Sequence, residues 1–106
     1  MSGISTHVLD TVKGEPAAGI VIRLEREGRE LGRGITDVDG RLADFGVGAL
    51  TAGVYRLVFE TEAYLGAGGA AFFPEVVVTF RADGRRPRYH VPLLLSPYAY
   101  STYRGS

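Results

Sequence analysis

The residues best suited to proton transfer are the two histidines, His7 and His90. An imidazole titrates near neutral pH, so its neutral form can take a proton and return it during a reaction. Both histidines lie in segments that we predict below to be strands, and two imidazoles on one sheet face could act on the same molecule. A strand histidine is more often a hydrogen-bonded structural residue, so spacing alone leaves that alternative open.

Further polar groups could assist them. Arg41 directly follows the Asp39-Gly40 turn, and its planar guanidinium suits carboxylates, imides and other flat oxyanions. The ending Tyr103-Arg104-Gly105-Ser106 adds a second guanidinium, hydroxyls and a carboxylate. Arg41 as an exposed turn cation and the tail as a frayed end are the alternatives. The tail directly follows the aromatic, turn-rich segment 96–102, which indicates that packing holds it.

Short β-strands must position these residues, because apolar side chains recur at every second position. The alternation is clearest in Ile20, Ile22 and Leu24. We predict one short helix at residues 62–65 and strands at residues 4–9, 19–26, 31–36, 54–59, 76–81 and 88–95. This spacing predicts an all-β fold, an antiparallel Greek-key β-sandwich of about seven to eight strands.

The period of two also assigns faces to the histidines. His90 shares its face with Pro92 and Leu94, and His7 shares its face with Ser5. Neither histidine lies in a metal-binding helix motif, and the chain has no phosphate-binding glycine loop before a helix. We therefore predict no metal and no cofactor.

Length and composition limit the possible functions. The 106 residues allow one domain, residues 1–106. Twelve basic residues balance twelve acidic ones, so we expect no binding of nucleic acid or of an anionic membrane. There is no cysteine, which excludes disulfides and thiolate chemistry. No signal segment and no membrane span are visible, so we expect a cytoplasmic protein.

Five segments resemble the transthyretin-like family and occur in the same order. They are residues 5–10 (STHVLD), 36–41 (TDVDGR), 72–76 (FFPEV), 89–98 (YHVPLLLSPY) and 100–106 (YSTYRGS). The Tyr-Arg-Gly-Ser ending is the most specific, because it marks the 5-hydroxyisourate hydrolase branch and is absent from the hormone-carrying branch. Asp37, Leu65 and Ala99 depart from the usual pattern, and none of them removes a proposed catalytic group.

The resemblance implies a homotetramer, a dimer of dimers, whose site lies at the dimer–dimer interface. The implied reaction is hydrolysis of the cyclic amide of 5-hydroxyisourate to 2-oxo-4-hydroxy-4-carboxy-5-ureidoimidazoline in purine catabolism. The family's polar site residues match His7, Arg41, His90 and Ser106, with Tyr103 and Arg104 completing the tail. Transthyretin itself has other residue types at the first three positions, so the match favours a hydrolase.

Our hypothesis for the mechanism is water attack on a ring carbonyl. His7 and His90 would position and deprotonate the water, and Arg41 would stabilise the oxyanion. Two alternatives remain: a carrier of a small hydrophobic ligand on the same fold, and a structural β-sandwich module whose histidines are merely packed.

Overall fold

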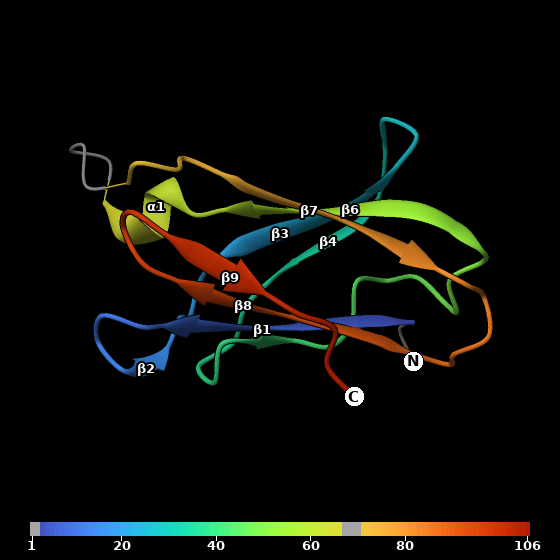
Figure 1. Ribbon diagram of the computed structural model, residues 1–106, viewed down its shortest axis with the longest axis horizontal. Helices are drawn as coiled ribbons and strands as arrows, with labels where there is room; N and C mark the ends of the chain where they lie inside the picture. The colour runs from blue at the N-terminus through green and yellow to red at the C-terminus, as the bar shows by residue number, and fades with distance from the viewer. Residues whose placement is uncertain (1–2, 67–70) are drawn as a thin grey trace.

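Two β-sheets lie face to face (Figure 1). The buried apolar side chains of both sheets form one core cluster. The computed structural model describes residues 3–66 and 71–106. In chain order the elements are β1 (Ile4–Asp10), β2 (Glu15–Pro16), β3 (Val21–Arg26), β4 (Arg29–Ile35), β5 (Arg41–Leu42), β6 (Gly53–Glu60), α1 (Glu62–Leu65), β7 (Val76–Ala82), β8 (Tyr89–Leu95) and β9 (Tyr100–Thr102). The predicted all-β sandwich and its short helix are confirmed.

The first sheet joins the beginning and the end of the chain. Its order is β2-β1-β8-β9, and β5 also pairs with β1. β1 and β8 run parallel, with Ser5 opposite His90 and His7 opposite Pro92. This pair differs from the antiparallel expectation, which the other described strand pairs follow. The parallel direction is possible because the chain builds the whole second sheet before it returns, and parallel strands require a long crossover.

The second sheet has the order β4-β3-β6-β7 and is antiparallel throughout its described pairs. A tight turn joins β3 to β4, and both of its central residues, Glu27 and Gly28, have positive φ angles of 52° and 76°. Two positive φ angles are typical of the hairpin turn whose twist matches that of the flanking strands. Strand β3 therefore ends at Arg26, as predicted for the strand at residues 19–26, but it begins two residues later, at Val21.

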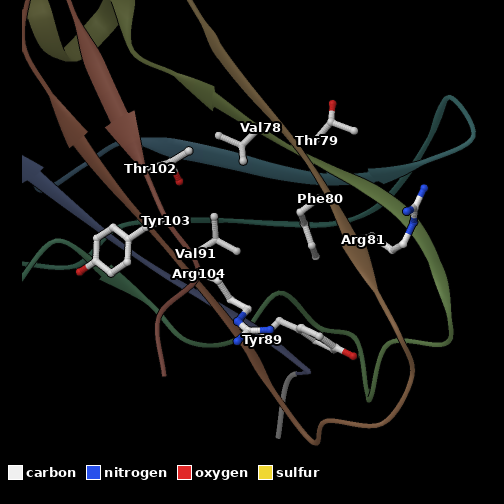
Figure 2. A pocket seen from close by; sticks show the side chains of 9 residues that line it. All are labelled: Val78, Thr79, Phe80, Arg81, Tyr89, Val91, Thr102, Tyr103 and Arg104. Atoms are coloured by element: carbon white, nitrogen blue, oxygen red, sulfur yellow. The ribbon is translucent and has the colours of Figure 1, made fainter.

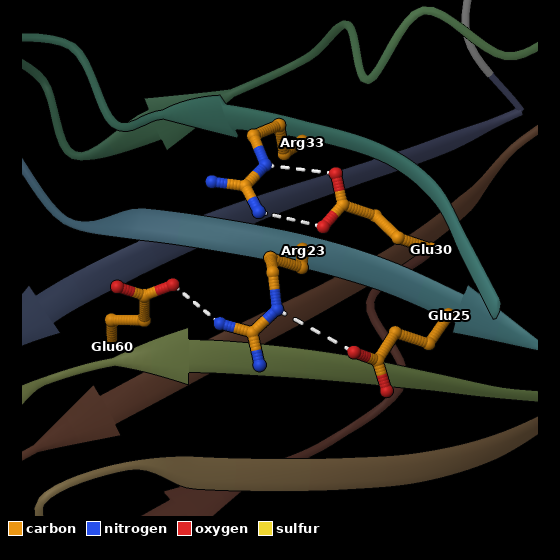
Figure 3. A network of polar contacts seen from close by, with 5 residues as sticks. All are labelled: Arg23, Glu25, Glu30, Arg33 and Glu60. Carbon is orange, nitrogen blue, oxygen red and sulfur yellow. Dashed lines mark hydrogen bonds and ion pairs between the residues drawn. The ribbon is translucent and has the colours of Figure 1, made fainter. Parts of the chain in front are cut away.

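Strand alternation separates the core from a charged outer face on the second sheet. Ile22 and Leu24 point inward and are fully buried. On the outer face, Arg23 hydrogen-bonds the carboxylates of Glu60 and Glu25 (Figure 3). Glu30 and Arg33 form a bidentate pair on the neighbouring strand (Figure 3). This face thus carries charge pairs that suit contact with water, and the exposed side chains of Ile35, Val54 and Val77 lie on the same face.

Helix α1 is anchored to the end of β1 by a buried carboxylate. Tyr64 Oη donates to Asp10 Oδ2 at 2.7 Å, and the Lys13 and Val12 amides donate to Asp10 Oδ1. Burial disfavours the Asp10 anion, but these hydrogen bonds outweigh it and hold the pKa of Asp10 below its usual value. Burial and the same carboxylate raise the pKa of Tyr64 to about 12. Residues 67–70, the glycine-rich segment that directly follows Gly66, lie outside the described residues.

Three strands, β2, β5 and β9, were not predicted. Each has only two or three residues, too few for alternation to be visible. β5 and β9 nevertheless flank the strands that carry the histidines, so they complete the first sheet around the candidate site. No helix in residues 3–66 and 71–106 has the length and apolar character needed to cross a membrane.

Candidate active site

The outer face of the first sheet brings His7, Arg41 and His90 together. His7 lies directly opposite Arg41 in the β1–β5 pair, so the two side chains leave the sheet on the same face. His90 lies opposite Ser5, two residues before His7, which makes the two imidazoles diagonal neighbours on that face. Both histidines are half-buried, while the residues beside them in sequence are buried. The predicted faces of both strands are therefore correct.

A rigid turn holds His7 and Arg41 in place. The Asp37 carboxylate accepts hydrogen bonds from the Asp39 and Arg41 amides, each at 2.9 Å. His7 Nε2 lies 2.9 Å from the Asp39 carbonyl oxygen. Because a carbonyl only accepts, Nε2 is the protonated nitrogen of this imidazole. Neutral His7 consequently keeps its lone pair on Nδ1.

The glycine of this turn is required by both conformation and space. Gly40 has a φ of 73°, and a Cβ at this position would lie 2.4 Å from the Val8 carbonyl oxygen. The Gly40 carbonyl also accepts a 2.7 Å hydrogen bond from the Val8 amide. The turn therefore packs directly on β1, which fixes the distance of Arg41 and the Asp39 carbonyl from His7.

His90 is held by a different set of contacts. Its Nδ1 lies 2.9 Å from Ser5 Oγ, and its carbonyl accepts a 2.7 Å hydrogen bond from the Gly105 amide. Partial burial lowers the pKa of His90, and the positive charge of Arg41, His7 and Arg88 lowers it further. A backbone hydrogen bond with Ser5 opposes this shift without reversing it. His90 is therefore neutral near pH 7 and can accept a proton.

A hollow of about 290 Å³ opens beside His90, a size suited to a small ligand. Its lining residues are Ser5, Thr6, Arg41, Ala43, Arg88, His90 and Ser106. Two guanidiniums face it, and its lining includes no aspartate or glutamate. Neither Arg41 nor Arg88 forms an ion pair with a carboxylate side chain of the described residues. The site thus offers unpaired positive charge to a flat molecule with several oxygens.

Tyr103 and Arg104 lie at another hollow, of about 320 Å³ (Figure 2). Its wall is formed with Val78 and Phe80 of β7 and with Tyr89 and Val91 of β8, among others. This hollow opens between edge strands of the two sheets and is lined mainly by apolar atoms. Of the six site residues predicted from the sequence, the structure thus gathers Arg41, His90 and Ser106 around one hollow. It places His7 on the same sheet face opposite Arg41, and Tyr103 and Arg104 at the other hollow.

Three residues at the site were not predicted as functional: Ser5, Arg88 and Gly105. Ser5 could have been found, because the strand period already placed it on the face of His7. Arg88 directly precedes the strand of His90, but nothing in the sequence shows that its charge reaches the hollow. The contact between Gly105 and His90 depends on the folding of the tail against β8, which has no local signal. In the described part of the chain, no three histidine or acidic side chains are grouped closely enough to hold a metal ion.

Fold and site together define a class of protein: a small two-sheet β-sandwich that carries two histidines and unpaired arginines on the outer face of one sheet. Comparison with known proteins identifies the family. The model of the HIUase/Transthyretin family matches residues 4–105. The chain belongs to this family.

Individual relatives agree with this assignment over nearly their full length. A 5-hydroxyisourate hydrolase of Mus musculus is 43% identical over 117 residues, which cover 99% of this chain and 96% of the relative. The solved structure of the 5-hydroxyisourate hydrolase of Klebsiella pneumoniae has a TM-score of 0.88 and 40% identity, and the match covers 100% of this chain and 94% of that one. A transthyretin of Sparus aurata also has a TM-score of 0.88, at 29% identity, with 99% and 97% covered.

Proposed function

We propose that this protein hydrolyses 5-hydroxyisourate to 2-oxo-4-hydroxy-4-carboxy-5-ureidoimidazoline, a step of urate breakdown. The observation that carries the proposal is the meeting of His7, Arg41 and His90 on one face of the first sheet. The relatives that bear the name 5-hydroxyisourate hydrolase, with about two fifths of their residues identical to this chain, support it. The site needs no cofactor for this reaction.

The reaction is acyl transfer to water. The water oxygen forms a bond to a ring carbonyl carbon while a neutral imidazole takes its proton, and a tetrahedral oxyanion results. The ring carbon–nitrogen bond then breaks, and the imidazolium returns its proton to the leaving nitrogen. The acyl carbon is released as a carboxylic acid, which loses the remaining proton of the water to the solvent and becomes a carboxylate. A positioned base of this kind contributes about 10²- to 10⁴-fold to the rate. His7 and His90 are the candidates for this base.

The remaining site residues bind and stabilise charge. Arg41 donates its hydrogen bonds to the oxyanion and afterwards to the product carboxylate, as its place opposite His7 allows. Ser106, which lines the hollow of His90, hydrogen-bonds the substrate or the attacking water. Tyr103 and Arg104 complete the binding region from the tail when chains associate.

The assembly that we propose is a homotetramer, a dimer of dimers. Two features support association. β7 and β9 are edge strands, and exposed strand edges favour pairing with another chain. The outer face of the first sheet around the histidines also lacks the dense charge pairs of the second sheet, so a second subunit can cover it. The cytoplasm remains the predicted compartment, and residues 1–106 the predicted single domain.

The test is a spectroscopic assay of fresh 5-hydroxyisourate, generated by enzymatic oxidation of urate. We expect the protein to accelerate loss of the substrate absorbance. Replacement of His7, Arg41 or His90 with alanine should lower the rate at least about a hundredfold, the scale of a lost base or oxyanion donor. Arg56→Ala, which removes an exposed guanidinium from β6 of the other sheet, is the matched control. Near-normal rates in the three site variants would reject the proposed site.

A further inference from the structure

The imidazole of His90 is contacted from two sides by residues without an assigned role. On one side lies Ser5 of β1, whose side chain leaves the sheet on the same face because the two residues are paired in the parallel ladder. Ser5 Oγ is 2.9 Å from His90 Nδ1, a normal hydrogen-bond distance. Ser5 is only 6% exposed, so solvent competes little for this contact.

On the other side lies Gly105 of the tail. A Cβ on Gly105 would be 2.5 Å from His90 Cδ2, 3.1 Å from Cγ and 3.2 Å from Cβ, so the backbone of the tail lies directly against the ring. Gly105 is not among the glycines with a positive φ angle. The requirement for glycine at this position therefore arises from the space that the imidazole occupies and not from an unusual backbone conformation.

These two contacts determine which atoms of the ring face the hollow. Nδ1 and Cδ2 are the two ring atoms bonded to Cγ, and each is in contact with the protein. Cε1 and Nε2 form the tip of the ring, which projects away from the sheet because strand side chains stand roughly perpendicular to it. His90 lines the hollow of Arg41 and Ser106, so the tip is the part available to a bound molecule.

We propose that Ser5 and Gly105 are positioning residues for His90: Ser5 accepts a hydrogen bond from Nδ1–H, and Gly105 leaves the space that keeps the ring upright, so that Nε2 presents its lone pair to the hollow. As a catalytic claim this rests on the proposed function.

The proposal assigns matching arrangements to the two histidines. His7 has Nε2 occupied by the Asp39 carbonyl and its lone pair on Nδ1. His90 has Nδ1 occupied by Ser5 and its lone pair on Nε2. Each ring thus uses one nitrogen for orientation and keeps the other as a base, an arrangement in which the anchoring hydrogen bond selects the tautomer.

The first experiment measures the tautomer directly, without substrate. In protein labelled with nitrogen-15 at histidine, proton–nitrogen correlation spectra above pH 7 should show a protonated Nδ1 and an unprotonated Nε2 for His90. Ser5→Ala should shift His90 toward the opposite tautomer or a mixture, whereas Ser101→Ala, which removes an exposed hydroxyl from β9 of the same sheet, should leave it unchanged. A protonated Nε2 in the unaltered protein would overturn the proposal.

The second experiment measures turnover. Ser5→Ala and Gly105→Ala should each lower kcat by about 10- to 100-fold, the usual effect of losing a residue that orients a functional side chain, with little change in KM. Gly48→Ala is the matched glycine control, because a Cβ there meets nothing within 4 Å and its φ is not positive. A normal kcat in both variants would overturn the proposal, and so would an effect confined to KM, which would assign Ser5 to substrate contact.

Gly105→Ala keeps the test decisive if Ser5→Ala does not fold, because it adds one methyl group against the His90 ring and removes no buried side chain. The two readouts also separate this proposal from the proposed function. If the unaltered protein does not hydrolyse 5-hydroxyisourate, the function is wrong, while the spectrum still decides the orientation of His90. If it does hydrolyse the substrate and the variants match it, the function stands and the positioning role is wrong.

Discussion

His7 and Arg41 face each other directly across the β1–β5 pair, although three further strands, β2, β3 and β4, separate them along the chain. The shared face is set by strand geometry, since side chains of directly opposed residues project to the same side. The turn that carries Arg41 also supplies the Asp39 carbonyl that orients His7. A single short segment therefore places one guanidinium and selects the tautomer of one imidazole.

The first prediction concerns this turn. Gly40→Ala should lower both stability and activity, because a Cβ would lie 2.4 Å from the Val8 carbonyl oxygen and must displace the turn from β1. Gly46→Ala is the matched control: its φ of 76° carries the same left-handed cost of about 1–2 kcal/mol, but its Cβ meets nothing within 4 Å. Urea unfolding and turnover should therefore both be worse for Gly40→Ala. Equal behaviour of the two variants would contradict the close packing of the turn.

The second prediction concerns pH. Because burial and the charges of Arg41, His7 and Arg88 lower the pKa of His90, the acidic limb of kcat/KM should lie below the ordinary histidine value of about 6.5. Arg88→Gln removes one of these charges and should move the limb to higher pH. Arg85→Gln, an exposed residue of the same loop that does not line the hollow, should leave the limb in place. An unchanged limb in Arg88→Gln would show that this charge does not reach His90.

The same lowered pKa has a consequence for stability. The folded state holds His90 neutral, so below about pH 6.5 the unfolded chain binds more protons than the folded one. His90 should therefore reduce the free energy of unfolding as the pH falls through this range. His90→Gln should remove this part of the pH dependence, which urea unfolding at several pH values and one fixed protein concentration can measure. A slope that persists unchanged in His90→Gln would assign it to other groups.

The third prediction concerns the anchor of α1. Tyr64→Phe removes a donor from the buried Asp10 carboxylate and should destabilise the fold by about 1–3 kcal/mol. The pKa of Asp10 lies below its usual value, so its contribution is present above about pH 4 and is lost as the pH falls through the folded value. Tyr64→Phe should weaken this acid sensitivity. Tyr98→Phe, at a ring that is 73% exposed, should leave stability and acid sensitivity unchanged.

The fourth prediction separates the hydrolase from a carrier on the same fold. Removal of residues 103–106 should abolish hydrolysis, because it takes away Ser106 and the Gly105 contact with His90. The fold should persist, since Tyr100–Thr102 retain their pairing with β8. Circular dichroism and the 5-hydroxyisourate assay test both statements. Full hydrolysis by the shortened chain would favour a role for the tail that is unrelated to catalysis.

Strand alternation in the sequence predicted the faces of the first sheet but not its pairing. The period of two placed Ser5 with His7 and separated His90 from Val91, because a side chain's direction follows from its own strand. The parallel register of Ser5 with His90 could not be predicted, since it depends on contact between opposite ends of the chain. The role of Gly105 could not be predicted for the same reason, because its partner His90 lies on another segment, β8.

The resemblance to the family was sufficient to predict the site residues. Which of them lie together could be seen only in the structure. Tyr103 and Arg104 directly precede Gly105 in the tail, yet they line a hollow with β7 rather than the one beside His90. Arg88 shows the converse. Nothing in the sequence marks it as functional, and its charge lowers the pKa of His90 because both residues line the same hollow.

The parallel ladder between β1 and β8 also has a consequence for biosynthesis. His7 leaves the ribosome long before its neighbour His90, because all strands of the second sheet are translated between β1 and β8. Contacts between such distant residues slow folding, so we expect formation of this ladder to be a late event. A nascent chain would then have no hydrolase activity until β8 and β9 have paired with the rest of the first sheet.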